Sequence, residues 1–143
     1  MAVRPEAIRV RLKKLREMIA RLERIRARGE EVYNNDDLLQ SAAERVLQIA
    51  TQCVLDIGNH IIAEMSLPLP TDNDEIIDTL CKAGIISEEL AASLAGIGGF
   101  RNVLVHDYLT LDQGRIFHEH LGRLDDLRNF ATEIIKFLDE IDK

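Results

Sequence analysis

The chain has 143 residues, a length that suits one domain with a core able to fold alone. Aromatic residues make up only 4% and Trp is absent, which favours helices over a sheet-rich sandwich. No stretch approaches about 20 uninterrupted apolar residues, so a membrane span is excluded, and the charged N-terminus does not fit a secretory signal. Cys53 and Cys81 lack metal-site spacing and are typical of buried thiols. We therefore expect a cytoplasmic protein without a metal or other cofactor.

The net charge of −7 conceals an uneven distribution of basic residues. Residues 1–28 carry ten Lys or Arg against three Glu, whereas the rest of the chain carries eight basic and 22 acidic residues. Such asymmetry often marks an interaction surface. A solvated basic helix face that pairs with acidic helices of the same bundle explains it equally well, so both interpretations stay open.

Hydrophobic spacing predicts two long helices in the first half of the chain. Apolar residues at steps of three and four predict a helix over residues 5–28, with Pro5 in a first helical position and Gly29 as its stop. A broad apolar face predicts a second helix over residues 36–65. Gly58 in its middle lowers helix propensity by about 1 kcal/mol, which predicts a close helix approach or a kink.

The second half of the chain predicts three more helices. A short one covers residues 74–83, another starts at Ser87, and a long final helix spans residues 112–141. Long amphipathic helices with short connections favour an all-α fold, an antiparallel up-and-down bundle of four long helices plus a short one. Residues 1–143 then form a single helical domain, with the basic helix 5–28 packed on the bundle.

The candidate catalytic residues lie in the segment RNVLVHDY, residues 101–108, near the end of the helix that starts at Ser87. In a helix, Asn102 and His106 lie one turn apart, and Arg101 and Tyr108 two turns apart, so each pair shares a face. Three glycines precede the segment, which predicts tight packing against a neighbour or a break in the helix.

An arginine and a histidine suit RNA cleavage without a metal ion. With a pKa of about 6.5, histidine can remove the proton of a ribose 2′-OH or protonate the leaving 5′-oxygen. Arginine stays charged, and its planar fork matches two phosphate oxygens. One residue of each kind is an incomplete site, so we expect a homodimer that brings two of each to one cleft. The alternative is that Arg101 and His106 only complement the dipole of the helix C-terminus.

The segment RNVLVHDY resembles the R-x4-6-H signature of HEPN domains. More narrowly, it resembles the R-x4-H-x-Y form of HepT-type toxins, which pair with minimal nucleotidyltransferases (MNT). Residues 39–50 and their continuation through 56–62 also resemble the second helix of that family. The resemblance covers residues from about 33 to 143.

This resemblance implies the toxin of a type II or type VII-like toxin–antitoxin pair, a metal-independent endoribonuclease that acts on cellular RNA. Arg101 and His106 are then catalytic, and Asn102 supports them. The cognate MNT antitoxin is expected to attach AMP to Tyr108. Attached AMP would place bulk and negative charge beside the cleft and block the phosphate of the substrate.

The basic first helix has a candidate function in this picture, because its cations can attract RNA phosphates. The candidates are Arg4, Arg9, Arg11, Lys13, Lys14 and Arg16. Acidic antitoxin surfaces would attract the same residues. Two other interpretations of the chain stay open: a non-catalytic helical subunit that binds a nucleotide or scaffolds a nucleotidyltransferase, and a purely structural helical dimer.

Overall fold

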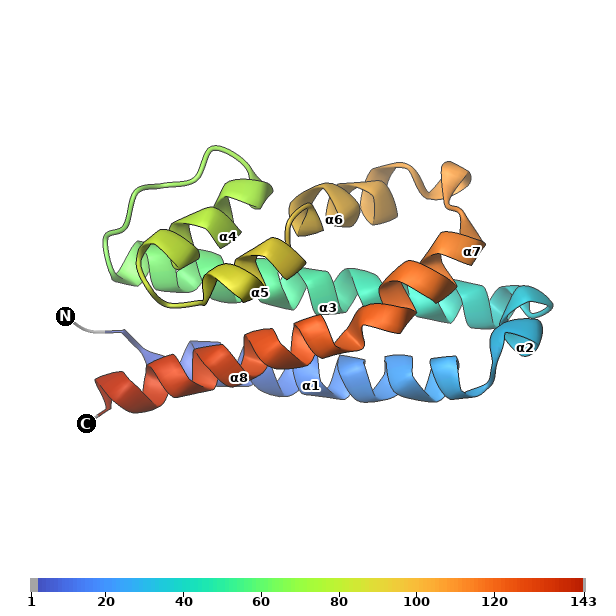
Figure 1. The fold of residues 1–143 in the computed structure, drawn as a ribbon, viewed down its shortest axis with the longest axis horizontal. Coiled ribbons are helices and arrows are strands. Elements are labelled where there is room, and N and C mark those ends of the chain that lie inside the picture. The colour runs from blue at the N-terminus through green and yellow to red at the C-terminus, as the bar shows by residue number, and fades with distance from the viewer. Residues whose placement is uncertain (1–2, 143) are drawn as a thin grey trace.

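The computed structural model describes residues 3–142 and, for Tyr108, the backbone alone. Over these residues the chain is helical and contains no strand (Figure 1), as expected for an all-α fold. The α-helices are α1 (Pro5–Ala27), α2 (Glu30–Asn34), α3 (Asp37–Glu64), α4 (Asn73–Lys82), α5 (Glu88–Ser93), α6 (Ile97–His106), α7 (Gln113–Arg115) and α8 (Leu124–Ile141). A 3-10 turn follows α6 (η1, Tyr108–Thr110), and a π-helical turn (η2, Ile116–His120) and a 3-10 turn (η3, Leu121–Arg123) join α7 to α8.

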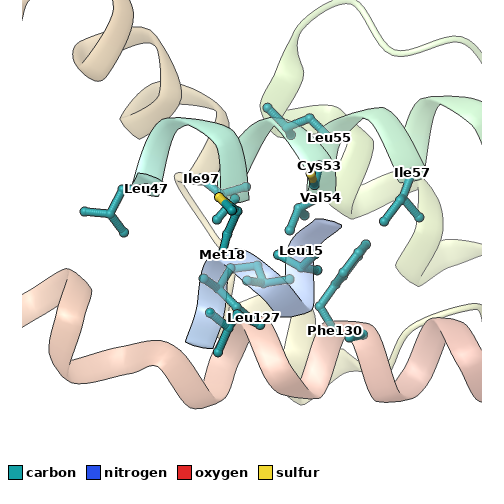
Figure 2. Close-up of a cluster of buried hydrophobic side chains, with 14 of the residues drawn as sticks. Leu15, Met18, Leu47, Cys53, Val54, Leu55, Ile57, Ile97, Leu127 and Phe130 are labelled. Carbon is teal, nitrogen blue, oxygen red and sulfur yellow. The ribbon is translucent and has the colours of Figure 1, made fainter. Parts of the chain in front are cut away.

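The long helix α3 lies at the centre, with α1 and α8 on one side and α4 and α6 on the other (Figure 1). Figure 2 shows the core where these elements meet: Met18 of α1, Val54 of α3 and Phe130 of α8 point toward one another. All three side chains are fully buried. Burying a side chain of this size stabilises a fold by roughly 1.5–3 kcal/mol, so the apolar stripes predicted from spacing are what hold the helices together.

The central helix α3 has the length and apolar composition to cross a membrane. However, 61% of its most apolar window is buried inside the fold, against α1, α4 and α6. This is the pattern of a core helix. Both cysteines are free thiols: Cys53 of α3 is buried as expected, whereas Cys81 of α4 is only half-buried.

Two of the expected helices are divided in the structure. The helix starting at Ser87 becomes α5 and α6, because Gly96 between them adopts a left-handed backbone with φ of 83°. The final helix, expected over residues 112–141, becomes α7, η2, η3 and α8. The expectation of four long helices was therefore wrong: α1, α3 and α8 are long, and residues 101–106 lie on a ten-residue helix.

Glycine lets the start of α6 dock on the start of α4. Gly98 is buried, and a Cβ on it would lie 2.6 Å from Asn73 Cβ and 2.8 Å from the Asp74 backbone nitrogen. Asp74 Oδ1 accepts hydrogen bonds from the backbone N–H groups of Gly98 (2.9 Å) and Gly99 (3.3 Å). The carboxylate thus satisfies N–H groups that a helix start leaves without an intrahelical partner, and the contact ties the start of α6 to the start of α4.

We expect Gly98→Ala to destabilise the fold by roughly 1–3 kcal/mol relative to Gly99→Ala, because the added methyl meets the backbone of α4 and no rotamer can relieve it. Gly99→Ala is a matched control: its Cβ would meet only Asp74 Oδ2, at 3.9 Å. Both variants gain the same helix propensity, which cancels in the comparison. Urea unfolding followed by circular dichroism measures the difference, and equal midpoints would contradict the close approach.

Candidate active site

Helix α6 turns one face to the core and another to the surface. Ile97 and Leu104 are buried, which anchors the helix against α3, whereas Asn102 and His106 are exposed. Asn102 and His106 are one turn apart within α6, so the expected shared face is confirmed. Imidazole and amide groups are therefore open to a ligand that approaches from outside the domain.

Arg101 is half-buried at the edge of the exposed face, between α6 and α3. Its Nε donates to Gln52 Oε1 of α3 at 2.8 Å, and its Nη1 donates to Asn102 Oδ1 at 3.2 Å. Asn102 thus contacts the guanidinium directly. Viewed down the axis of α6, Asn102 lies between Arg101 and His106. Along the axis, Arg101 and His106 are separated by about 7.5 Å.

Tyr108 does not continue the helix that carries Arg101. Asp107 leaves helical geometry with φ of −114° and ψ of 32°, and Tyr108 begins the 3-10 turn η1. The expectation that Arg101 and Tyr108 share one helix face was therefore wrong. The side chain of Tyr108 lies outside the described part of the structure. The turn itself is at the surface, since Leu109 is 87% exposed.

His120 is a feature that sequence reasoning did not single out. Its ring stacks on Phe100 of α6, with centroids 3.6 Å apart and planes 9° from parallel. Burial lowers the pKa of His120 below its usual value, so the neutral imidazole is favoured. The stacked pair lines two small cavities, of about 110 and 330 Å³, whose linings include neither Arg101 nor His106. The predicted site is thus open helix surface, not part of these cavities.

Among the described residues, the basic side chains of α1 make no hydrogen bond or ion pair with the side chains of Arg101, Asn102 or His106. In Figure 1, α1 and α6 lie on opposite sides of α3. Arg9 pairs with Asp142 at 3.3 Å and Asp139 at 3.8 Å, which supports the interpretation that part of the basic face pairs within the bundle. Arg11 is half-buried and its Nη1 donates to a backbone carbonyl of its own helix. The other basic candidates are exposed: Arg4, Lys13, Lys14 and Arg16.

The arrangement on α6 can hold a phosphate and move a proton. A fixed guanidinium offers N–H donors to phosphate oxygens, and an exposed imidazole can exchange protons with a bound hydroxyl. Within residues 3–142, no three side chains of His, Cys, Asp or Glu converge as metal ligands would. Gln52 was missed because the contact joins residues 49 positions apart, which helical spacing cannot reveal.

Comparison with known proteins identifies the family. The model of the family described as "Ribonuclease HepT-like" matches residues 15–134, most of the chain. The chain therefore belongs to the HepT-like ribonuclease family, as the resemblance of its RNVLVHDY segment indicated.

Individual relatives agree with this assignment. The chain is 30% identical to the "tRNA nuclease HepT" of Aphanizomenon flos-aquae over 80% of this chain and 78% of that protein. It is 27% identical to the "mRNA nuclease HepT" of Shewanella oneidensis, over 84% and 90% of the two chains. The solved structure of a tri-AMPylated Shewanella oneidensis HEPN toxin in complex with an MNT antitoxin superposes with a TM-score of 0.82 at 25% identity, covering 92% of this chain and 98% of that one.

Proposed function

We propose that this chain is the toxin of a toxin–antitoxin pair and a metal-independent endoribonuclease that acts on cellular RNA in the cytoplasm. The observation that carries the proposal is that an exposed His106 and an Arg101 held by Gln52 lie on the same short helix, α6, in a chain of the HepT-like ribonuclease family. Relatives named as tRNA and mRNA nucleases support the choice of RNA as substrate.

The proposed reaction needs no group other than side chains of this kind. His106 takes the proton of a ribose 2′-OH, the 2′-oxygen attacks phosphorus, and the bond from phosphorus to the 5′-oxygen breaks. The imidazolium of the partner subunit's His106 gives its proton to the 5′-oxygen, so that a 2′,3′-cyclic phosphate and a 5′-hydroxyl remain. Arg101 stabilises the charge that builds on the phosphate oxygens, supported by Asn102. A two-fold homodimer supplies the second histidine.

The proposed partner is an MNT antitoxin that attaches AMP to Tyr108. The complex of an AMPylated HEPN toxin with an MNT antitoxin supports this, as does the surface position of the turn η1 that begins at Tyr108. An adenylyl group on this turn adds bulk and negative charge close to the end of α6, which opposes the binding of an RNA phosphate.

The purified chain is expected to cleave RNA equally well with and without an excess of EDTA, because the proposed reaction takes its acid, base and cation from side chains. Sequencing and end-group chemistry of the products should find 2′,3′-cyclic phosphate and 5′-hydroxyl ends. Loss of cleavage in EDTA, restored by a divalent cation, would contradict the mechanism. RNA that is bound but never cut would favour the non-catalytic nucleotide-binding or scaffolding subunit instead.

A further inference from the structure

The guanidinium of Arg101 ends a row of side-chain hydrogen bonds that starts on α3. Gln52 Nε2 donates to Asp56 Oδ1 at 2.7 Å, and Gln52 Oε1 accepts from Arg101 Nε at 2.8 Å. All three side chains are half-buried, and Gln52 and Asp56 lie one turn apart on the core helix. We propose that Gln52, oriented by Asp56, is a positioning residue that presents Arg101 to an RNA phosphate; this rests on the catalytic role proposed above for Arg101.

Asp56 decides which end of the Gln52 amide faces Arg101. A carboxylate only accepts hydrogen bonds, so the NH₂ group of the amide must face Asp56. A guanidinium only donates, so the carbonyl oxygen must face Arg101. An amide released from Asp56 could turn its NH₂ group toward the guanidinium and set donor against donor. The two neighbours together leave one favourable orientation.

This row leaves three N–H donors of the guanidinium without an acceptor among the described residues. Arginine has five N–H donors. Gln52 takes the one on Nε and Asn102 takes one on Nη1, and no other acceptor among the described residues bonds the group. Both N–H groups of Nη2 and one of Nη1 therefore remain to donate to the oxygens of a phosphate.

The neutral amide of Gln52 directs Arg101 without cancelling its charge. A carboxylate in the same place would form an ion pair with the guanidinium and would repel a phosphate at close range. In the structure the nearest carboxylate of this row, on Asp56, stands beyond the amide and bonds to its NH₂ group. Glutamine at this position thus orients the guanidinium without the charge neutralisation of a direct ion pair.

The test measures RNA binding apart from cleavage. A 2′-O-methyl oligoribonucleotide has no 2′-hydroxyl to react, and its dissociation constant can be measured by fluorescence anisotropy. We expect Gln52→Leu to weaken binding about tenfold, the order expected when a hydrogen bond to a charged group is lost. Gln48→Leu is the matched control: it lies one turn earlier on α3, is half-buried, and its side chain bonds no other described residue. Its binding should be unchanged, and equal weakening by both variants would overturn the proposal.

A double-mutant cycle separates positioning from general stability. In an Arg101→Ala background, Gln52→Leu should cause no further loss of binding, because the residue through which it acts is gone. An equal loss in both backgrounds would overturn the proposal. If Arg101→Ala alone binds and cleaves RNA as the unaltered chain does, the proposed role of Arg101 fails, and this outcome is visible without any change at Gln52.

Isosteric variants keep the test decisive if Gln52→Leu unfolds. Gln52→Glu preserves the size of the side chain and should weaken RNA binding at least tenfold. The slope of log binding constant against log salt concentration should also fall by the equivalent of about one phosphate contact. Asp56→Asn keeps an acceptor oxygen for Gln52 and should bind nearly as tightly as the unaltered chain, whereas Asp56→Leu should behave like Gln52→Leu. Unchanged binding by Gln52→Glu, or equal effects of the two Asp56 variants, would contradict the inference.

Discussion

His106→Ala and Arg101→Ala are each expected to abolish growth inhibition and to lower RNA cleavage by at least about a hundredfold. A positioned acid or base contributes roughly 10²–10⁴-fold, and a cationic donor to the developing phosphate charge about as much. His106 is exposed, so its removal should leave no cavity in the core. Cleavage of labelled RNA by the purified variants measures the loss, and far-UV circular dichroism should match that of the unaltered chain.

A second histidine offers the control for this result. His118 is exposed on η2, and its Nε2 lies 2.9 Å from Glu30 Oε1, away from the residues proposed to act on RNA. His118→Ala should therefore remain toxic and cleave RNA at the unaltered rate. Toxicity that survives both His106→Ala and Arg101→Ala would remove the catalytic assignment, and the chain would then fit a binding or scaffolding subunit.

Tyr108→Phe is expected to remain toxic and to escape neutralisation by AMP transfer. The change removes the hydroxyl that would accept AMP and leaves Arg101 and His106 in place. Co-expression with the nucleotidyltransferase partner should then fail to restore growth, and intact-mass measurement should show no added AMP. Full silencing of the variant would mean that modification at Tyr108 is not how the toxin is controlled.

The chain provides an internal control for the site of modification. It has two tyrosines, and the other one, Tyr33, is fully buried with its hydroxyl bonded to Gln113. Burial raises the pKa of Tyr33 to about 12, and Glu44 adds to the effect, so its hydroxyl is also a poor nucleophile. Adenylylation of the unaltered chain should therefore map to Tyr108 alone; AMP found on Tyr33 would contradict the described burial.

Helical spacing determined more of the bundle than of the site. The bounds expected for the first two helices, 5–28 and 36–65, agree with α1 and α3 within two residues, because long apolar stripes are strong signals. The glycines before residue 101 predicted a helix break or tight packing, and the structure shows both: Gly96 divides α5 from α6, and Gly98 packs against α4. The division of the final helix was not predicted, because its π-helical turn η2, whose His120 stacks on Phe100 of α6, has no local sequence signal.

The sequence by itself determined which residue types the site offers, because an arginine, an asparagine and a histidine at that spacing must lie along one short stretch of helix. Only the tertiary structure decided how they are held. Gln52 and Asp74 come from α3 and α4, and their bonds to α6 form only when distant segments pack side by side. Hydrogen bonds act over about 3 Å, so contacts across 24 to 49 residues of chain exist only in the folded domain.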